Sequence, residues 1–165
     1  MSTFEDFKIS NPLRNALSDL GFERPTPIQS DSFSVVLSGK DMVGIAQTGT
    51  GKTLGYMLAL LQDLKYSKEP NLRVLVLVPT RELVIQVVEE IEKFSKYLSL
   101  KTIGIYGGTN INTQKQAISE GADIIVATPG RLYDLALSRA IQLKTIKKLV
   151  IDEVDVMLDL GFRFQ

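Results

Sequence analysis

The sequence has 165 residues, 44% hydrophobic and 23% charged, and shows neither a bilayer-spanning apolar run nor a signal peptide, so it predicts one cytoplasmic globular domain. It contains no cysteine and no histidine, which excludes disulfides, thiolate chemistry, zinc sites and histidine-based acid–base catalysis. Nineteen basic residues balance nineteen acidic ones, so any binding of nucleic acid must use a local surface rather than a global positive field.

Helix signals dominate the first part of the chain. An asparagine followed by proline opens a predicted amphipathic helix over residues 11–20, which a glycine ends. A threonine followed by proline repeats the signal for a second helix over residues 27–37. The apolar run Met42–Ile45 then has the length and composition of a short strand. We therefore expect two helices before the first strand.

A glycine-rich stretch, Ala46–Thr53, follows this predicted strand and precedes an apolar-periodic helix over residues 54–64. Gly49 and Gly51 allow positive φ angles, so backbone N–H groups can approach a phosphate closely. A helix that begins near Lys52 would add the positive end of its dipole. The pattern is typical of a phosphate-binding loop, although its first residue is alanine where the general motif has glycine. The alternative is an ordinary strand-to-helix turn.

Apolar strands and helices alternate in the remainder of the chain. A helix with apolar residues at helical spacing is expected over residues 81–97, and helix-like stretches separate the later strands. The strand-like runs are residues 72–78, 102–106, 124–127 and 149–151. This alternation indicates an α/β fold with a parallel sheet and helices on both faces. Ligands of such sheets bind beyond the carboxyl ends of the strands.

An acidic stretch, Asp152–Asp155, stands at the end of the last strand-like run. Asp152 could hold Mg²⁺ through water, and Glu153 could accept a proton from an attacking water. In the phosphate-binding loop, Lys52 would supply charge to the β- and γ-phosphates, and the Thr53 hydroxyl could ligate Mg²⁺. The alternative is that the acidic residues only cap a helix over residues 156–160. Taken together, the two motifs favour hydrolysis of a nucleoside triphosphate.

With these motifs the sequence resembles the DEAD-box ATP-dependent RNA helicases, and the resemblance covers essentially the whole chain. The further motifs that carry it, in the family's order, are Gly21–Gln29 (the Q motif), Pro79–Leu83, Gly107-Gly108 and Thr128–Arg131. The resemblance implies the N-terminal RecA-like domain, with Q-motif helices in residues 1–39 and a phosphate-loop core in residues 40–165. It implies ATP and Mg²⁺ as cofactors, single-stranded or duplex RNA as partner, and neither a membrane nor a metal cluster.

The resemblance also implies how ATP is bound. Gln29 would hydrogen-bond the adenine edge, the backbone near Arg24 would do likewise, and Phe4 would stack on the ring. The phosphates would be held by Gln47, Thr48, Gly49, Thr50, Gly51, Lys52 and Thr53. The alternative for Phe4 and Phe7 is an N-terminal hydrophobic anchor, a role for which Phe7 is the better candidate. For Gln29 the alternative is a solvated polar position on a helix.

RNA binding is implied through the sugar–phosphate backbone. Glycines and helix N-termini offer backbone donors to phosphate, and Arg81 and Arg131 add charge without reading bases. The residues implied are Pro79, Thr80, Arg81, Gly107, Gly108, Thr128, Pro129, Gly130 and Arg131. Each element has an alternative interpretation as a loop turn, and Arg81 could also pair with a neighbour at the start of its helix.

The sequence departs from the family pattern in two places. Val154 replaces the alanine of the family's acidic motif, and we expect it to occupy an apolar position with some repacking. The chain ends at Gln165, whereas family members continue into a second domain that supplies an arginine finger and half of the RNA cleft. A strand of the first domain would also be missing, so we expect either a gap in the sheet or the phosphate-loop and acidic-motif strands forced together.

Three functions follow from these observations. The first is the ATP-binding portion of an RNA helicase, with very slow ATP hydrolysis by the isolated chain because an arginine finger is worth about 10³-fold or more in rate. The second is a catalytically silent nucleotide- or RNA-binding fragment. The third is a phosphate-loop ATPase without an RNA partner, which burial of Arg81 and Arg131 in structural ion pairs away from one common surface would favour.

Overall fold

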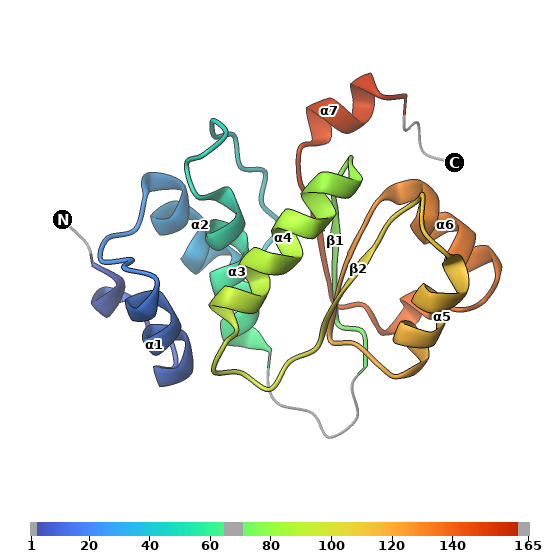
Figure 1. Cartoon of the computed structure of the whole chain (residues 1–165). Coiled ribbons are helices and arrows are strands. Elements are labelled where there is room, and N and C mark those ends of the chain that lie inside the picture. Colours follow the sequence, from blue (N-terminus) through green and yellow to red (C-terminus); the bar gives the residue numbers. More distant parts are fainter. Residues whose placement is uncertain (1–2, 65–70, 162–165) are drawn as a thin grey trace. The chain divides into compact units, whose positions relative to one another are not determined.

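The structure, a computed structural model, describes residues 3–64 and 71–161. Gln165, on which the expectation about the chain's end depends, lies outside the described residues. The chain divides into two compact units, one formed by residues up to 66 together with 90–99, the other by residues 67–89 and from 100 onward (Figure 1). We call them unit 1 and unit 2. Within the described ranges, no helix is both long and apolar enough to cross a membrane.

Unit 1 is helical. Its elements are η1 (Phe4–Asp6), α1 (Asn11–Asp19), α2 (Pro27–Leu37), α3 (Lys52–Asp63) and the last residues of α4 (Arg81–Phe94). The two predicted N-terminal helices are therefore confirmed. Helix α2 packs closely on α3, where the Ser32 hydroxyl donates a hydrogen bond to the Gly55 carbonyl at 2.9 Å. A Cβ at Gly55 would lie at ordinary contact distance, 3.4 Å, from the Ser32 oxygen, so the two helices approach each other closely here.

Helix α4 ends at Phe94, three residues earlier than the spacing predicts. The Ser95 hydroxyl donates to the Ile91 carbonyl at 2.7 Å, and the chain turns there. The Lys96 ammonium and the Tyr97 hydroxyl then donate to the Asp19 carboxylate at 2.6 and 2.7 Å. The hydrogen bonds from Lys96 and Tyr97 lower the pKa of the Asp19 carboxyl group. The hydrogen bond to Asp19 raises the pKa of the Lys96 ammonium. The turn thus ties the end of α1 to the residues after α4.

Unit 2 is built on a four-stranded sheet with the order β2-β3-β1-β4, in which every neighbouring pair is parallel. The strands are β1 (Val74–Leu77), β2 (Thr102–Ile105), β3 (Ile124–Ala127) and β4 (Lys148–Ile151). The other elements of this unit are the first part of α4, α5 (Ile111–Ser119), α6 (Pro129–Leu137), η2 (Leu143–Thr145) and α7 (Val154–Asp159). The predicted α/β class with a parallel sheet is confirmed.

Alternate side chains along each strand point to opposite faces of this sheet, and both faces are covered. On one face, Leu75, Ile105 and Ile125 form a core with Leu132 and Leu135 of α6, and residues of α5 pack against it. On the other face, Gly104 of β2 meets Val84 and Val88 of α4. Helices therefore cover both faces, as the alternation of strands and helices in the sequence predicts.

The predicted strand at Met42–Ile45 is wrong. These residues form no strand, and the side chains of Val43 and Ile45 are 91% and 95% exposed. An extended segment becomes a strand only when a neighbour satisfies its backbone groups, and residues 42–45 pair with none of the described strands. Of the two expected alternatives, the one in which this segment is forced against the acidic-motif strand is therefore wrong, and the other, a gap in the sheet, stays a prediction.

Candidate functional site

The glycine-rich loop has the local geometry that its glycines predict. Gly49 and Gly51 adopt φ angles of +81° and +80°, in the left-handed region that other residues rarely enter. Gly51 is the N-terminal cap of α3, which begins at Lys52. The Thr50 hydroxyl donates to the Gln47 carbonyl at 2.7 Å and closes the turn. The loop therefore leads into the start of a helix, where backbone N–H groups have no partner within the helix.

Gln29 of α2 is held against this loop. Its side chain is 2% exposed, so the interpretation as a solvated helix position is wrong. The Gln29 amide nitrogen donates to the Gly51 carbonyl at 3.1 Å, and its amide oxygen accepts from the Thr26 N–H at 2.9 Å. The Q motif and the phosphate-binding loop are thus joined within unit 1 by one buried amide.

The N-terminal aromatic residues form a cluster in unit 1. Phe4 is 5% exposed and meets Phe7 edge to face, with ring centroids 5.4 Å apart. Phe7 is only partly buried and stacks on Phe33 at 4.7 Å. The expectation that Phe7 is the better anchor is wrong, because Phe4 is the more deeply buried of the two. Arg24 lies on the surface.

The acidic motif follows β4 in unit 2. The Asp152 N–H donates to the Leu77 carbonyl at 2.9 Å, which prolongs the pairing of β4 with β1. The Asp152 carboxylate accepts from the Glu153 N–H at 3.0 Å. Glu153 adopts φ 51° and ψ 46°, a left-handed conformation uncommon for a residue other than glycine. Val154 is exposed, so the expected apolar position with repacking is wrong.

The residues proposed for Mg²⁺ belong to different units, Thr53 to unit 1 and Asp152 to unit 2. Within the described part of the chain, no three acidic side chains gather into a group that could hold a metal by themselves. A hydroxyl and one carboxylate nevertheless suit Mg²⁺, which prefers oxygen ligands and takes the rest from phosphates and water. The donor types therefore fit a cation that arrives with a nucleotide.

The RNA-binding elements implied by the resemblance all follow strands of unit 2. Residues 79–81 follow β1, Gly107-Gly108 follow β2, and residues 128–131 follow β3. The three strands are parallel neighbours, so their carboxyl ends lie at one edge of the sheet. The Thr128 N–H donates to the Ile105 carbonyl at 2.9 Å, which fixes the start of α6 beside the end of β2.

Arg81 lies on the surface at the start of α4. Its guanidinium carbon is 5.2 Å from the centroid of the Tyr106 ring, within the range of a cation–π contact. Gly108 is close to the same side chain, since a Cβ built on it would lie 3.8 Å from the nearest Arg81 nitrogen. The Arg81 charge is thus exposed beside the glycine pair.

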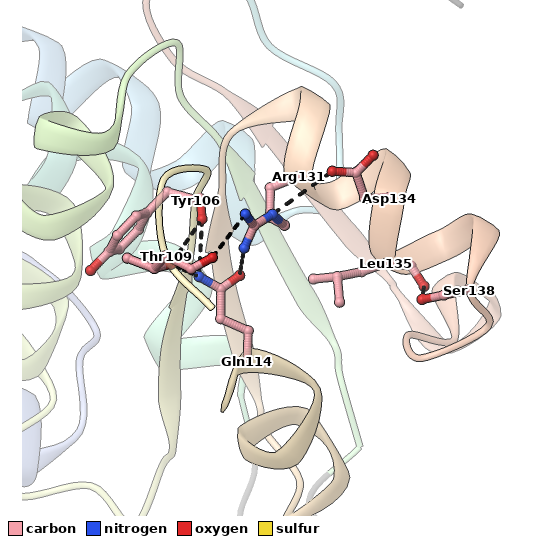
Figure 2. A network of polar contacts seen from close by, with 7 residues as sticks. All are labelled: Tyr106, Thr109, Gln114, Arg131, Asp134, Leu135 and Ser138. Atoms are coloured by element: carbon pink, nitrogen blue, oxygen red, sulfur yellow. Dashed lines mark hydrogen bonds and ion pairs between the residues drawn. The ribbon is translucent and has the colours of Figure 1, made fainter. Parts of the chain in front are cut away.

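Arg131 of α6 points into the loop after β2 (Figure 2). Its two terminal nitrogens donate to the Gln114 side-chain oxygen and to the Thr109 carbonyl, both at 3.1 Å, and its Nε lies 3.8 Å from the exposed Asp134 carboxylate. The side chain is 11% exposed. Both arginines therefore meet residues 106–109, and neither lies apart in an isolated ion pair.

Gln114 of α5 contacts these candidate residues and was not predicted from the sequence. It is 8% exposed, and its amide nitrogen donates to the Tyr106 carbonyl at 3.0 Å and to the Thr109 hydroxyl at 2.8 Å (Figure 2). One signal was present in the sequence. Gln114 lies three residues after Ile111 and four before Ile118, so a polar residue occupies the apolar face of a predicted helix.

The parallel sheet covered by helices, with its motif loops at the carboxyl edge, defines unit 2 as part of a RecA-like α/β protein. Residues 26–165 match the family model described as DEAD/DEAH box helicase, and the chain belongs to this family. The resemblance drawn from the motifs is thereby confirmed.

Curated relatives align with nearly the whole chain. It is 44% identical over 160 residues to the DEAD-box ATP-dependent RNA helicase CshA of Bacillus subtilis, covering 97% of this chain and 32% of that protein. It is 45% identical over 169 residues to the probable ATP-dependent RNA helicase DDX43 of Homo sapiens, covering 99% and 26%. It is 42% identical over 165 residues to the ATP-dependent RNA helicase DeaD of Escherichia coli, covering 98% and 26%. The chain thus spans about a third or less of the length of these relatives.

Proposed function

We propose that the chain is the ATP-binding portion of an ATP-dependent RNA helicase acting in the cytoplasm. The observation that carries the proposal is the buried Gln29 amide, which donates to the carbonyl of Gly51 in the phosphate-binding loop. A general phosphate-loop protein does not need a side chain from an upstream helix at this place. A protein that couples recognition of the base to the conformation of its phosphate-binding loop does need such a side chain.

Nucleotide binding uses unit 1 in this proposal. The backbone N–H groups from Gln47 to Thr53 and the start of α3 hold the phosphates, with charge from Lys52. Gln29 and the backbone near Arg24 read the adenine edge, which requires the 2%-exposed Gln29 amide to be uncovered when ATP binds. Phe4 stacks on the base, which requires its 5%-exposed ring to be uncovered when ATP binds.

Hydrolysis also requires the acidic motif of unit 2. The Thr53 hydroxyl and the Asp152 carboxylate are the groups that would hold Mg²⁺. When bound, the ion neutralises the charge that develops on the phosphates. Glu153 orients the attacking water and accepts its proton. Its left-handed backbone is the kind of strained conformation that clusters at functional sites.

RNA binding uses the carboxyl edge of the sheet in unit 2. Backbone N–H groups of Gly107-Gly108 and of the starts of α4 and α6 face phosphates there, and the exposed Arg81 adds charge. The contacts read no bases, so binding is tolerant of RNA sequence and weakens as salt rises.

A nucleotide-selectivity experiment tests the proposal. Titration of the chain with ATP and with GTP should give at least tenfold tighter binding of ATP, since a site that hydrogen-bonds its ligand rejects an analogue with the wrong donors. Gln29→Leu should remove most of this preference. Gln142→Leu, which changes an exposed glutamine of unit 2, is the matched control and should leave the preference unchanged.

The outcomes separate the candidate functions. Equal affinity for ATP and GTP in the unaltered chain contradicts the adenine-reading role and favours a general phosphate-loop protein. Binding of neither nucleotide and of no single-stranded RNA would favour a silent fragment.

A further inference from the structure

Gln114 is placed where its side chain reaches two separate elements, a loop and a helix. It lies in the first turns of α5, facing inward, and its amide uses both ends (Figure 2). The nitrogen donates to the Tyr106 carbonyl and the Thr109 hydroxyl, and the oxygen accepts from Arg131. One buried side chain therefore joins the loop after β2 to the start of α6.

Because the Gln114 amide is buried, loss of any of its hydrogen bonds is costly. Gln114 is 8% exposed, so water cannot replace a partner that is lost without the surrounding structure opening. Helix packing alone would favour an apolar residue here, between Ile111 and Ile118 on the same helix face. A buried glutamine with three hydrogen bonds instead specifies one arrangement of the residues around it.

The arrangement extends to Arg81. Gln114 fixes the backbone of Tyr106 through its hydrogen bond to the Tyr106 carbonyl. The Arg81 guanidinium carbon in turn lies 5.2 Å from the centroid of the Tyr106 ring. Arg131 completes the connection, because it donates to Gln114 and to the Thr109 carbonyl. The Arg131 charge is thus directed into the protein, whereas Arg81 remains on the surface.

We propose that Gln114 is a positioning residue for RNA binding, which locks the Gly107-Gly108 loop, the start of α6 and Arg81 into one phosphate-binding surface. Arg131 acts with it as an internal brace. This role rests on the proposed binding of the RNA backbone at the carboxyl edge of the sheet. It adds a residue outside the loops themselves and separates the two arginines, with Arg81 as the phosphate contact and Arg131 as the support.

The test measures affinity for a fluorescently labelled single-stranded oligouridylate over a range of salt concentrations. Gln114→Met has a similar volume without the hydrogen bonds, and we expect it to weaken binding by about tenfold at every salt concentration. Its salt slope should equal that of the unaltered chain, because no phosphate contact is removed. Arg81→Gln should instead reduce the slope by about 0.7.

Matched variants keep the test decisive. Gln116→Met alters an exposed glutamine of the same helix and should bind RNA like the unaltered chain. Gln114→Glu keeps an acceptor for Arg131 but loses the donor to Tyr106 and Thr109, so it should also bind about tenfold more weakly and serves if Gln114→Met does not fold. Amide hydrogen exchange at residues 107–110 should become faster in both Gln114 variants, without RNA present.

Each outcome bears on one proposal. If the unaltered chain binds oligouridylate and a folded Gln114 variant binds it equally well, the positioning role is wrong and the proposed RNA binding stands. Weaker binding by Gln114→Met without faster amide exchange at residues 107–110 would make Gln114 a direct RNA contact and overturn its role as a support. No binding by the unaltered chain rejects the proposed RNA function, and the inference with it.

Discussion

Gly51 is the residue at which the phosphate-binding loop and the Q motif depend on each other. Its φ of +80° requires glycine for conformational reasons, and its carbonyl accepts the hydrogen bond from Gln29. A Cβ at this position would lie 2.3 Å from the Gln29 nitrogen. The Gln29 side chain is buried and bonded at both ends, so it cannot move aside without losing those bonds.

Gly51→Ala and Gly49→Ala form a matched pair. Both glycines have positive φ, but a Cβ at Gly49 meets nothing within 4 Å. We expect Gly49→Ala to lower the free energy of unfolding by about 1–2 kcal/mol, the cost of a left-handed conformation. Gly51→Ala should cost about 1–3 kcal/mol more, because it also breaks the buried Gln29 hydrogen bonds. Denaturant titration of both variants measures the difference.

The origin of that difference can be checked in a second background. In a Gln29→Ala background, the total loss of unfolding free energy caused by Gly51→Ala should fall to about that caused by Gly49→Ala, since the crowded side chain is gone. Equal losses for the two glycine variants in the unaltered chain would show that Gln29 does not crowd the loop.

At the scale of elements, the contact of α4 with the sheet depends on Gly104. A Cβ at Gly104 would lie 3.0 Å from Val84 Cγ1 and 3.3 Å from Val88 Cγ2. Val84 is fully buried, so it has no solvent space into which to move. The missing side chain of β2 therefore sets how closely the first turns of α4, which carry Arg81, approach the sheet.

Gly104→Ala should destabilise the chain by about 1–3 kcal/mol through overpacking, even though alanine is the better strand former. Thermal or denaturant unfolding measures the loss. Val84→Ala should recover part of it when added to Gly104→Ala, although Val84→Ala is destabilising by itself because it removes buried methyl groups. If the two losses simply add, the contact does not limit the packing.

At the scale of the whole molecule, β4 is an edge strand among the described residues. It pairs only with β1, and its alternate side chains Leu149 and Ile151 are exposed. An edge with unpaired backbone groups and apolar side chains is a template for pairing with another chain. The sheet that brings the motif loops together at the carboxyl ends of its strands therefore also exposes β4 as an edge strand that can pair with another chain.

We expect the chain to self-associate with rising concentration, and Leu149→Lys to reduce this association at least severalfold, because charge on an edge strand opposes pairing. Sedimentation velocity over a concentration series measures it. Leu137→Lys places the same charge on an exposed leucine of α6 and should have little effect. A monomeric unaltered chain, or equal effects of the two variants, would contradict the role of the edge.

The sequence by itself determined most of the elements and the order of the motifs. The helices that begin after Ser10 and Thr26, the glycine conformations at Gly49 and Gly51, and the parallel sheet follow from caps, backbone sterics and apolar periodicity, which act within a few residues. The placement of the acidic motif and of the three RNA-binding elements after strands also follows, because parallel strands end at one edge.

Only the tertiary structure decided which neighbours the side chains have. Residues 42–45 have strand composition but no strand beside them, and Phe4 rather than Phe7 is the more buried aromatic residue. Gln29 meets Gly51, and Gln114 meets Arg131, across 22 and 17 residues of sequence. Such contacts depend on how whole elements pack, and a local pattern of residue types carries no information about the partner at the other end.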